Sequence, residues 1–273
     1  MVTAFVTETA MSLSIRTAFR SFLMLLLACG SLCFNSAHAQ DYAREQRWMN
    51  EVKAGLVVGE PVMIKSGLSS HEFLGLYTEV PNPVATVVIV HGVGVHPDHG
   101  IIGVLRTKLA DLGYNTLAIQ MPVLAADAQP EAYTHLFPDA ADRITRAAAW
   151  LRAKGQNNLV LVSHSMGTRM ANFYFGDREA DTPFHAWVAL GMSTTYAPVT
   201  GTYRFPMLDV YGSNDLPAVR ATADERRRQL DPTKGSRQVE VEKADHFYAG
   251  QEAALVMVVD QFLRGTGVAK RAS

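Results

Sequence analysis

An apolar run at residues 159–162 leads directly into the pentapeptide Ser-His-Ser-Met-Gly at 163–167. An apolar run of this kind, bounded by turn-forming residues, is typical of a strand that is buried on both faces of a sheet. The residues that follow can form a helix. A serine at a sharp turn between a strand and a helix, with small residues two positions before and after it, forms a nucleophile elbow. The pentapeptide therefore predicts that Ser165 is a catalytic nucleophile.

The match to this pattern is imperfect, because Ser163 stands where glycine is usual, whereas Gly167 fits. Small residues are needed at both positions because the strained turn is crowded by the flanking strand and helix. The alternative for Ser165 is a helix N-cap after a strand. The pentapeptide alone does not decide between these interpretations, so the prediction depends on partners elsewhere in the chain.

Two later segments supply candidate partners. An apolar strand is predicted from residue 205 onward, and it leaves Asp215 just past its carboxyl end. The alternating segment 237–245 predicts a strand near a sheet edge, and it is followed by His246. The chain order Ser165, Asp215, His246, each at the end of a strand, is that of the α/β-hydrolase arrangement. Because the carboxyl ends of parallel strands lie at one edge of a sheet, we expect these side chains to meet there.

The residue types suit acyl transfer. A serine hydroxyl is a weak nucleophile at neutral pH, and a neutral imidazole within hydrogen-bond reach takes its proton. His246 is the candidate base, and Asp215 is the candidate carboxylate that fixes its tautomer and stabilises the imidazolium. Asp209 and Asp245 are rival acids, but Asp209 lies inside the predicted strand and Asp245 is adjacent to the histidine. The alternatives are a half-exposed loop histidine and an aspartate that stabilises a turn.

A second glycine-containing segment, His-Gly-Val-Gly at 91–94, follows an apolar strand predicted at 86–90. In a hydrolase of this kind, backbone N–H groups after the nucleophile and after the third strand stabilise the oxyanion. Met166 and Val93 are the candidate donors, with Gly94 as the second choice for the loop. The alternative is an ordinary glycine-rich turn between a strand and a helix.

The substrate pocket is predicted from neighbouring loops. The loop 123–139 is long for a connection and carries aromatic side chains, so we expect it to roof the crevice, or else to pack on the body of the domain. The loop 191–204 is too short for an inserted cap domain. The residues expected to contact the substrate are Gly92, Gly94, His164, Tyr133 and Phe137.

Segments 90–98 and 117–125 resemble a family of exported bacterial proteins with the α/β-hydrolase fold, known as a domain of unknown function. The resemblance covers residues 61–264 and implies a hydrolase-like fold and site, without supplying a substrate. The alternation of strands and helices independently predicts an α/β fold: a mostly parallel central sheet, helices on both faces and no large cap domain.

The expected elements follow from hydrophobic periodicity. Strands are predicted at 60–64, 72–80, 86–90, 115–121 and 186–190, the first two antiparallel. Helices are predicted at 41–53, 101–112, 140–154, 218–230 and 252–263. The basic run Arg226-Arg227-Arg228 is interpreted as a solvated surface face.

The first 39 residues have the pattern of a secretory signal peptide: basic residues, the apolar stretch 22–28 and a cleavage site at Ala37-His38-Ala39. A lipoprotein site at Cys29 is the minor alternative. We expect a periplasmic or secreted protein with a lead-in segment at 40–60, the hydrolase domain at 61–265 and a flexible tail at 266–273.

Charge and cysteine content exclude several function classes. The formal net charge is −1, which does not favour nucleic acid or an anionic surface as a partner. The two cysteines, Cys29 and Cys33, both fall inside the signal peptide, so the mature chain has neither a disulfide framework nor a catalytic thiol. No cofactor is expected, and the sequence does not determine the oligomeric state.

The sequence thus predicts a serine hydrolase that acts on a carboxylic ester or a related acyl bond. One alternative is a non-catalytic envelope binding protein on the same fold, since fold does not fix function. The other is a metal-dependent hydrolase, because histidines and an aspartate crowd together after the third strand and such clusters can bind zinc. The residues of that cluster are His91, His96, Asp98 and His99.

Overall fold

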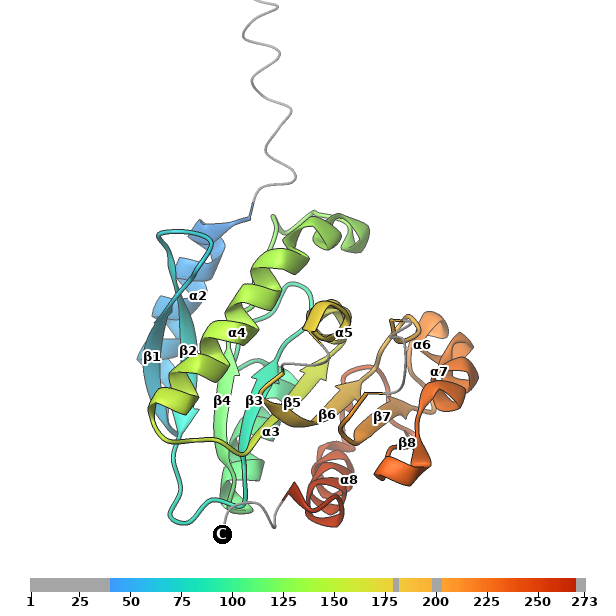
Figure 1. Cartoon of the computed structure of the whole chain (residues 1–273). Helices are drawn as coiled ribbons and strands as arrows, with labels where there is room; N and C mark the ends of the chain where they lie inside the picture. The colour runs from blue at the N-terminus through green and yellow to red at the C-terminus, as the bar shows by residue number, and fades with distance from the viewer. Residues whose placement is uncertain (1–39, 179–181, 198–202, 269–273) are drawn as a thin grey trace, which may run out of the picture. The chain divides into compact units, whose positions relative to one another are not determined.

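The computed structural model describes residues 40–178, 182–197 and 203–268, which are built around one eight-stranded sheet (Figure 1). The strands are ordered β1-β2-β4-β3-β5-β6-β7-β8. Their bounds are β1 Glu60–Lys65, β2 Glu72–Thr78, β3 Thr86–Val90, β4 Asn115–Ile119, β5 Leu159–His164, β6 Phe184–Leu190, β7 Met207–Gly212 and β8 Arg237–Val241. β2 pairs antiparallel with β1 and β4, and the later pairs are parallel. The predicted mostly parallel sheet is therefore confirmed.

Burial of the strands follows their place in the sheet. β3, β4 and β5 lie in the middle, and every residue in them is buried. Strands covered on both faces are mostly apolar, and the polar residues of these three strands lie at strand ends. The edge strand β8 is mostly half-buried or exposed, as its alternating sequence indicated.

Helices cover both faces of the sheet. Their bounds are α2 Tyr42–Gly55, α3 Gly100–Asp111, α4 Phe137–Ala153, α5 Met166–Arg178, α6 Pro217–Ala221, α7 Ala223–Gln229 and α8 Glu252–Gly265, with short 3-10 helices at Pro130–Leu136 and Pro232–Lys234. Side chains of α4 and α5 share one core with the sheet, and side chains of α3 and α8 share a second core on the other face. The front helices of Figure 1 are α4 and α5.

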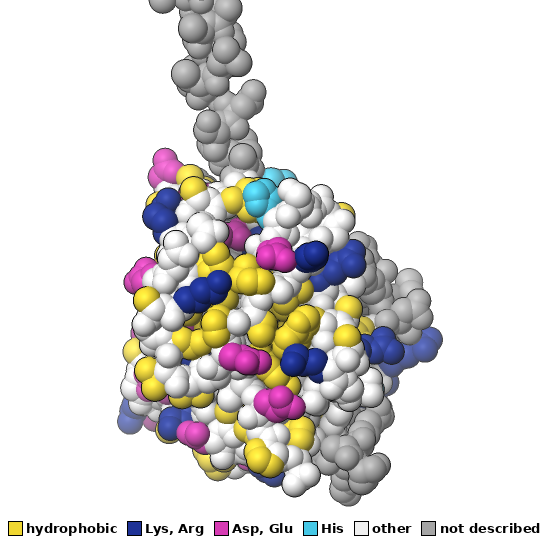
Figure 2. Space-filling view, turned by 90° about the vertical axis from the view of Figure 1, so that its left-hand side faces the viewer, with side chains coloured by type: hydrophobic (Ala, Val, Ile, Leu, Met, Phe, Trp, Pro, Cys, Tyr) yellow, Lys and Arg dark blue, Asp and Glu magenta, His cyan; other side chains and the backbone are white. Residues whose placement is uncertain are grey.

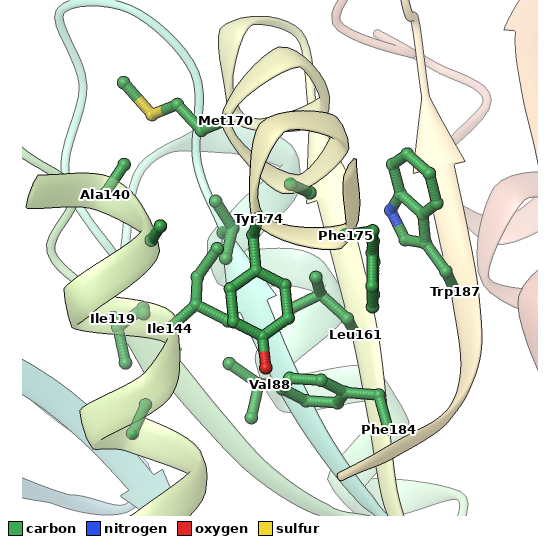
Figure 3. Packing of buried hydrophobic residues seen from close by; sticks show 14 of the residues in the cluster. Val88, Ile119, Ala140, Ile144, Leu161, Met170, Tyr174, Phe175, Phe184 and Trp187 are labelled. Atoms are coloured by element: carbon green, nitrogen blue, oxygen red, sulfur yellow. The ribbon is translucent and has the colours of Figure 1, made fainter. Parts of the chain in front are cut away.

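The core on the α4 and α5 side is rich in aromatic residues. Tyr174 and Phe175 of α5 reach toward the sheet, and Phe175 packs against Trp187 of β6 with ring centroids 4.9 Å apart (Figure 3). Ile144 of α4 lies beside the same group. Burying large aromatic side chains removes much apolar surface from water, so this packing fixes α5 against β5 and β6.

The predicted helix 218–230 is wrong in its continuity and in the position of its basic run. α6 and α7 are two short helices that meet at Thr222. Arg226 is fully buried, and its Nε lies 3.0 Å from Oδ2 of Asp209 in β7. A buried carboxylate requires a charged or hydrogen-bonding partner, which this arginine supplies. Of the three arginines in this run, Arg227 and Arg228 are the exposed ones.

The segment 40–60 is mainly the helix α2, which is tied to the body of the domain. Glu45 of α2 forms a buried ion pair with Arg143 of α4, at 2.9 Å. Figure 2 shows the side of the molecule that carries α2 and β1, where acidic and basic side chains are interspersed around hydrophobic ones. Among the described residues, no helix is long and apolar enough to cross a membrane.

Residues 266–268, expected to begin a flexible tail, belong to the folded domain. Val268 is buried, and its carbonyl accepts a hydrogen bond of 2.6 Å from Nδ2 of Asn158. The predicted signal peptide, with Cys29 and Cys33, lies outside the described residues.

Candidate active site

Ser165 lies in the turn between the end of β5 and the start of α5. Its φ is +57°, a left-handed value that is uncommon for a residue with a side chain. The turn is tightly packed, because a Cβ at Gly167 would lie 2.5 Å from the carbonyl oxygen of His91. Strained backbone of this kind gathers at functional sites, and here it projects a serine hydroxyl from the carboxyl edge of the sheet.

Ser163, at the position where glycine is usual, has its own hydrogen-bond partners. It is fully buried, and its Oγ accepts the indole N–H of Trp187 at 2.8 Å. Its hydroxyl also lies 3.4 Å from the carbonyl oxygen of Val188. Both partners belong to β6, so the hydroxyl is accommodated between neighbouring strands and the elbow keeps its shape.

The structure brings together the three side chains predicted to act on a substrate. His246 Nε2 lies 2.8 Å from Ser165 Oγ, and its Nδ1 lies 2.6 Å from Oδ1 of Asp215. The carboxylate also accepts backbone N–H groups from Leu216 at 2.7 Å and Gly212 at 3.2 Å. Since the carboxylate accepts the Nδ1 proton, Nε2 is left to accept the proton of the serine hydroxyl.

The same contacts keep the acid ionised. Burial by itself raises the pKa of Asp215, but the hydrogen bond from His246, the charge of that ring and the two backbone donors together hold the pKa below its ordinary value. An ionised carboxylate at this position stabilises the imidazolium that forms when His246 takes a proton.

The two rival acids have other partners. Both oxygens of Asp209 lie about 3 Å from Arg226 Nε, and Oδ2 also accepts an N–H of Gln238. Oδ1 of Asp245 accepts the backbone N–H groups of Phe247 and Ala249 in the loop that carries His246. The carboxylate of Asp209 thus stabilises a buried arginine, and the carboxylate of Asp245 stabilises the conformation of the loop.

Two backbone N–H groups near Ser165 remain available for a ligand. Neither Met166 nor Val93 donates its backbone N–H to another group within the described residues. Met166 is the first residue of α5, where unpaired N–H groups and the helix dipole favour negative charge. The loop with Val93 approaches closely, since a Cβ at Gly92 would lie 2.8 Å from the Cβ of Ser165. This arrangement suits a developing oxyanion.

His91 joins two of the loops at this edge. Its Nδ1 lies 2.8 Å from the carbonyl oxygen of Gly92, which can only accept, so Nδ1 carries the proton. Its Nε2 accepts the backbone N–H of Met121 at 2.8 Å. Complete burial lowers the pKa of His91 to about 3. The ring is therefore a neutral link that holds the loop after β3 against the loop after β4.

The cluster considered as a zinc site does not converge. Asp98 pairs with Arg106, and His96 and His99 contact each other through their rings, 5.5 Å apart. Within the part of the chain that the structure describes, no group of three His, Cys, Asp or Glu side chains is arranged to hold a metal ion.

His164 supports the loop of the candidate base. Its Nε2 donates to the backbone carbonyl of His246 at 2.8 Å, because a carbonyl oxygen only accepts. Burial, followed by the nearby charge of His246, lowers the pKa of His164 to about 4. The ring thus stays neutral at physiological pH and positions the neighbouring histidine.

A cavity of about 650 Å³ opens in front of Ser165, a size within the usual range for small-molecule sites. Its apolar wall comes from the first turns of α3, through Ile101, Ile102 and Val104. Phe247 is 61% exposed although it also lines the cavity, so an apolar side chain stands at the rim. Gly92, Val93, His164 and Met166 line the cavity as well.

Three other residues expected at the substrate do not line this cavity. Tyr133 is buried in the core, where its hydroxyl accepts the N–H of Leu124 at 3.2 Å. Phe137 packs on Phe173, with centroids 5.9 Å apart. The carbonyl oxygen of Gly94 accepts a hydrogen bond from Arg44 of α2 at 3.5 Å. Of the two outcomes expected for the aromatic residues of this loop, roofing the crevice or packing on the body of the domain, the structure shows the second for Tyr133 and Phe137.

The long loop still reaches the cavity, through Pro130 and Glu131 of its 3-10 helix rather than through its aromatic residues. The sequence interpretation also missed Arg169, which lines the cavity from α5. The signal that identifies it is its place in the first turn of the helix that follows the predicted elbow.

Comparisons with known proteins agree with this architecture. The family described as "Protein of unknown function (DUF3530)" matches residues 22–141. No curated protein matches the chain significantly.

Solved structures give the same fold. An alpha-beta serine hydrolase homologue from Coxiella burnetii is 14% identical, with a TM-score of 0.57 over 77% of this chain and 98% of that one. A serine hydrolase without a lid from Xanthomonas campestris is 14% identical, with a TM-score of 0.56 over 76% and 94%. A dienelactone hydrolase from Anabaena variabilis is 20% identical, with a TM-score of 0.61 over 76% and 97%.

The chain has the α/β-hydrolase fold, and the residues that the structure describes include no large cap domain. The expected resemblance to a family of unknown function with this fold is confirmed by the match over residues 22–141.

Proposed function

We propose that this protein is a serine hydrolase that cleaves a carboxylic ester or a related acyl bond. The observation that supports this proposal is the continuous chain of hydrogen bonds from Ser165 through His246 to Asp215, at the mouth of an apolar cavity. The similarity to solved hydrolases supports the class of reaction but not a particular substrate.

The geometry fits a two-step acyl transfer. His246 Nε2 takes the proton of Ser165 Oγ as the oxygen attacks the carbonyl carbon, and N–H groups of Met166 and Val93 bind the oxyanion. His246 then gives the proton to the departing alcohol oxygen as the C–O bond breaks, which leaves an acyl-serine. The same ring then takes a proton from water as the water oxygen attacks the acyl carbon. His246 returns this proton to Ser165 Oγ as the acyl C–O bond breaks, which releases the carboxylic acid.

A fluorophosphonate probe tests the nucleophile directly. We expect the folded wild-type protein to be labelled and Ser165→Ala to remain unlabelled. Ser163→Ala is the matched control, since it removes a neighbouring hydroxyl that is bonded to β6 and should still be labelled. Absence of labelling in folded wild-type protein would favour the non-catalytic binding protein instead.

A series of p-nitrophenyl esters of graded chain length then measures the pocket. The apolar wall of α3 predicts that kcat/KM rises with acyl length until the cavity is filled. A flat or falling series from acetate onward contradicts an apolar acyl pocket, even if Ser165 is reactive.

We further propose that residues 1–39 are a signal peptide and that the mature protein is periplasmic or secreted. The support is the sequence pattern, with its Ala37-His38-Ala39 site immediately before Gln40. Mass spectrometry of the exported protein should give an N-terminus at Gln40. A lipid-modified N-terminus at Cys29, abolished by Cys29→Ala, would instead establish a membrane-anchored form.

A further inference from the structure

Arg169 lines the cavity from α5, the helix that begins directly after the candidate nucleophile. It lies four residues after Ser165, in the first turn of α5, and both residues line the same cavity. The arginine is half-buried. Within the described residues it forms neither a hydrogen bond nor an ion pair, and its contact is with the ring of Phe137, at 5.7 Å from the centroid.

This situation differs from that of the buried arginines elsewhere in the fold. Arg106, Arg143 and Arg226 each pair with a carboxylate at 3.0 Å or less. Removing a charged group from water without a partner is costly, so buried charges are normally paired. An arginine that lines a cavity, is half-buried and forms no ion pair within the described residues is therefore suited to an anionic ligand.

The rest of the cavity limits the charge of that ligand. Its walls are mostly apolar, and its two acidic residues are Glu131, which is exposed, and Glu252, whose carboxylate accepts the N–H of Gly250. One cation beside two acids favours a singly charged group over a dianion such as phosphate. The planar guanidinium fork matches a carboxylate by two parallel hydrogen bonds.

We propose that Arg169 binds a carboxylate on the substrate, so that the preferred substrates are esters that carry a second, free carboxylate group. This inference rests on the proposed hydrolase function. The apolar wall of α3 would accommodate the hydrocarbon part of such a substrate, while Arg169 sets the register of its scissile ester relative to Ser165. The carboxylate belongs to the acyl part or to the alcohol part, and the experiment distinguishes these.

The kinetic test compares esters that differ only in charge. Monoethyl and diethyl esters of succinate, glutarate and adipate place a free carboxylate in the acyl part, and ethanol release is followed for both. The pair 3-acetoxypropanoate and its ethyl ester places it in the alcohol part. We expect wild type to prefer the anionic member about tenfold or more in kcat/KM in one of these two sets, and that set identifies the part of the substrate that carries the carboxylate. Tenfold or more is the range of a charge-assisted hydrogen bond.

Arg169→Gln should reduce that preference to near unity while it leaves turnover of the neutral ester within about twofold, because the neutral ester does not need the charge. Arg169→Lys keeps the charge but not the fork, so it should retain part of the preference. Glu131→Gln is the matched control, since it also changes one charge at the same cavity and should not lower the preference. The preference should weaken at high salt.

Binding to the Ser165→Ala variant separates this inference from the hydrolase proposal. Calorimetry should show monoethyl glutarate bound more tightly than diethyl glutarate, with the difference lost in the Ser165→Ala, Arg169→Gln double variant. If wild type hydrolyses no ester but this difference is present, the carboxylate site stands and the hydrolase proposal does not. If neutral esters are hydrolysed but Arg169→Gln affects both members of every pair equally, or no pair shows a preference, the carboxylate site is refuted.

Discussion

Ser163 offers a sharp test of how this elbow accommodates a hydroxyl where glycine is usual. Ser163→Ala keeps the Cβ but removes the Oγ that accepts the indole N–H of Trp187 at 2.8 Å. Both residues are fully buried, so the N–H would be left without a partner and without access to water. Leaving a buried donor unsatisfied costs about 1–3 kcal/mol. We therefore expect the free energy of unfolding to fall by about 2 kcal/mol.

Ser163→Gly, which restores the usual elbow residue, should be less stable still. Glycine in a strand adds a backbone entropy cost of about 0.5–1 kcal/mol relative to alanine. A loss of about 2 kcal/mol corresponds to about 4–8 °C in the melting temperature of a domain of this size. Activity per folded molecule should change little, because the Ser163 hydroxyl is bonded to β6 rather than to Ser165.

Urea denaturation followed by circular dichroism measures these changes, and Trp187→Phe completes a double-mutant cycle. Since each single variant breaks the same contact, the two should couple by about 1–2 kcal/mol. The exposed Ser70→Ala is the control and should stay within about 0.5 kcal/mol of wild type. A Ser163→Ala variant as stable as wild type, or additive effects in the cycle, would refute the idea that the indole contact offsets the missing glycine.

Three further predictions concern the loops and the buried charges. Gly92→Ala should lower kcat/KM by about a hundredfold, because the added Cβ would lie 2.8 Å from the Cβ of Ser165 and misplace the reacting groups. Gly55→Ala is the control and should leave ester turnover unchanged, because no atom lies within 4 Å of the added Cβ. The free energy of unfolding should fall as pH drops below 6.5, because burial lowers the pKa of His91 to about 3 from an ordinary 6.5 and only the unfolded chain then binds the proton. By pH 5 this contribution is about 2 kcal/mol. In urea titrations at pH 8 and pH 5, His91→Gln should lack this part of the pH dependence. Arg226→Met should lower the free energy of unfolding by about 3–5 kcal/mol, because it leaves the buried carboxylate of Asp209 without a partner. Adding Asp209→Leu should recover much of this loss, as measured by thermal melts. A double variant no more stable than the single one would argue against the buried ion pair.

Local sequence predicted the central strands because their burial is a property of short segments. β3 is predicted with the observed bounds, since five consecutive apolar or β-branched residues are bounded by turn signals. The positions of Ser165, Asp215 and His246 beyond strand ends were inferred in the same way. Parallel pairing then carries them to one edge, where the observed separations are 2.6 and 2.8 Å.

Contacts between distant segments were beyond such reasoning. A run of three arginines is typical of a solvated face, yet Arg226 turns inward because it pairs with the buried Asp209 of β7, which lies outside the run and outside its helix. Tyr133 and Phe137 have the composition of a pocket roof, but the side to which they turn depends on the neighbouring helices. Arg169 was not predicted as a site residue, because a single arginine on a helix indicates no function unless it lines a cavity, which only the tertiary structure shows.

The sequence by itself determined the alternation of strands and helices, the order of the candidate catalytic residues and the turn that strains Ser165. These follow from periodicity, turn chemistry and the shared edge of parallel strands, which act over short stretches of chain. Only the tertiary structure decided which charges are paired, which aromatic rings are buried and which side chains line the cavity. Those outcomes depend on the removal of water between segments far apart in the chain, and no local pattern encodes it.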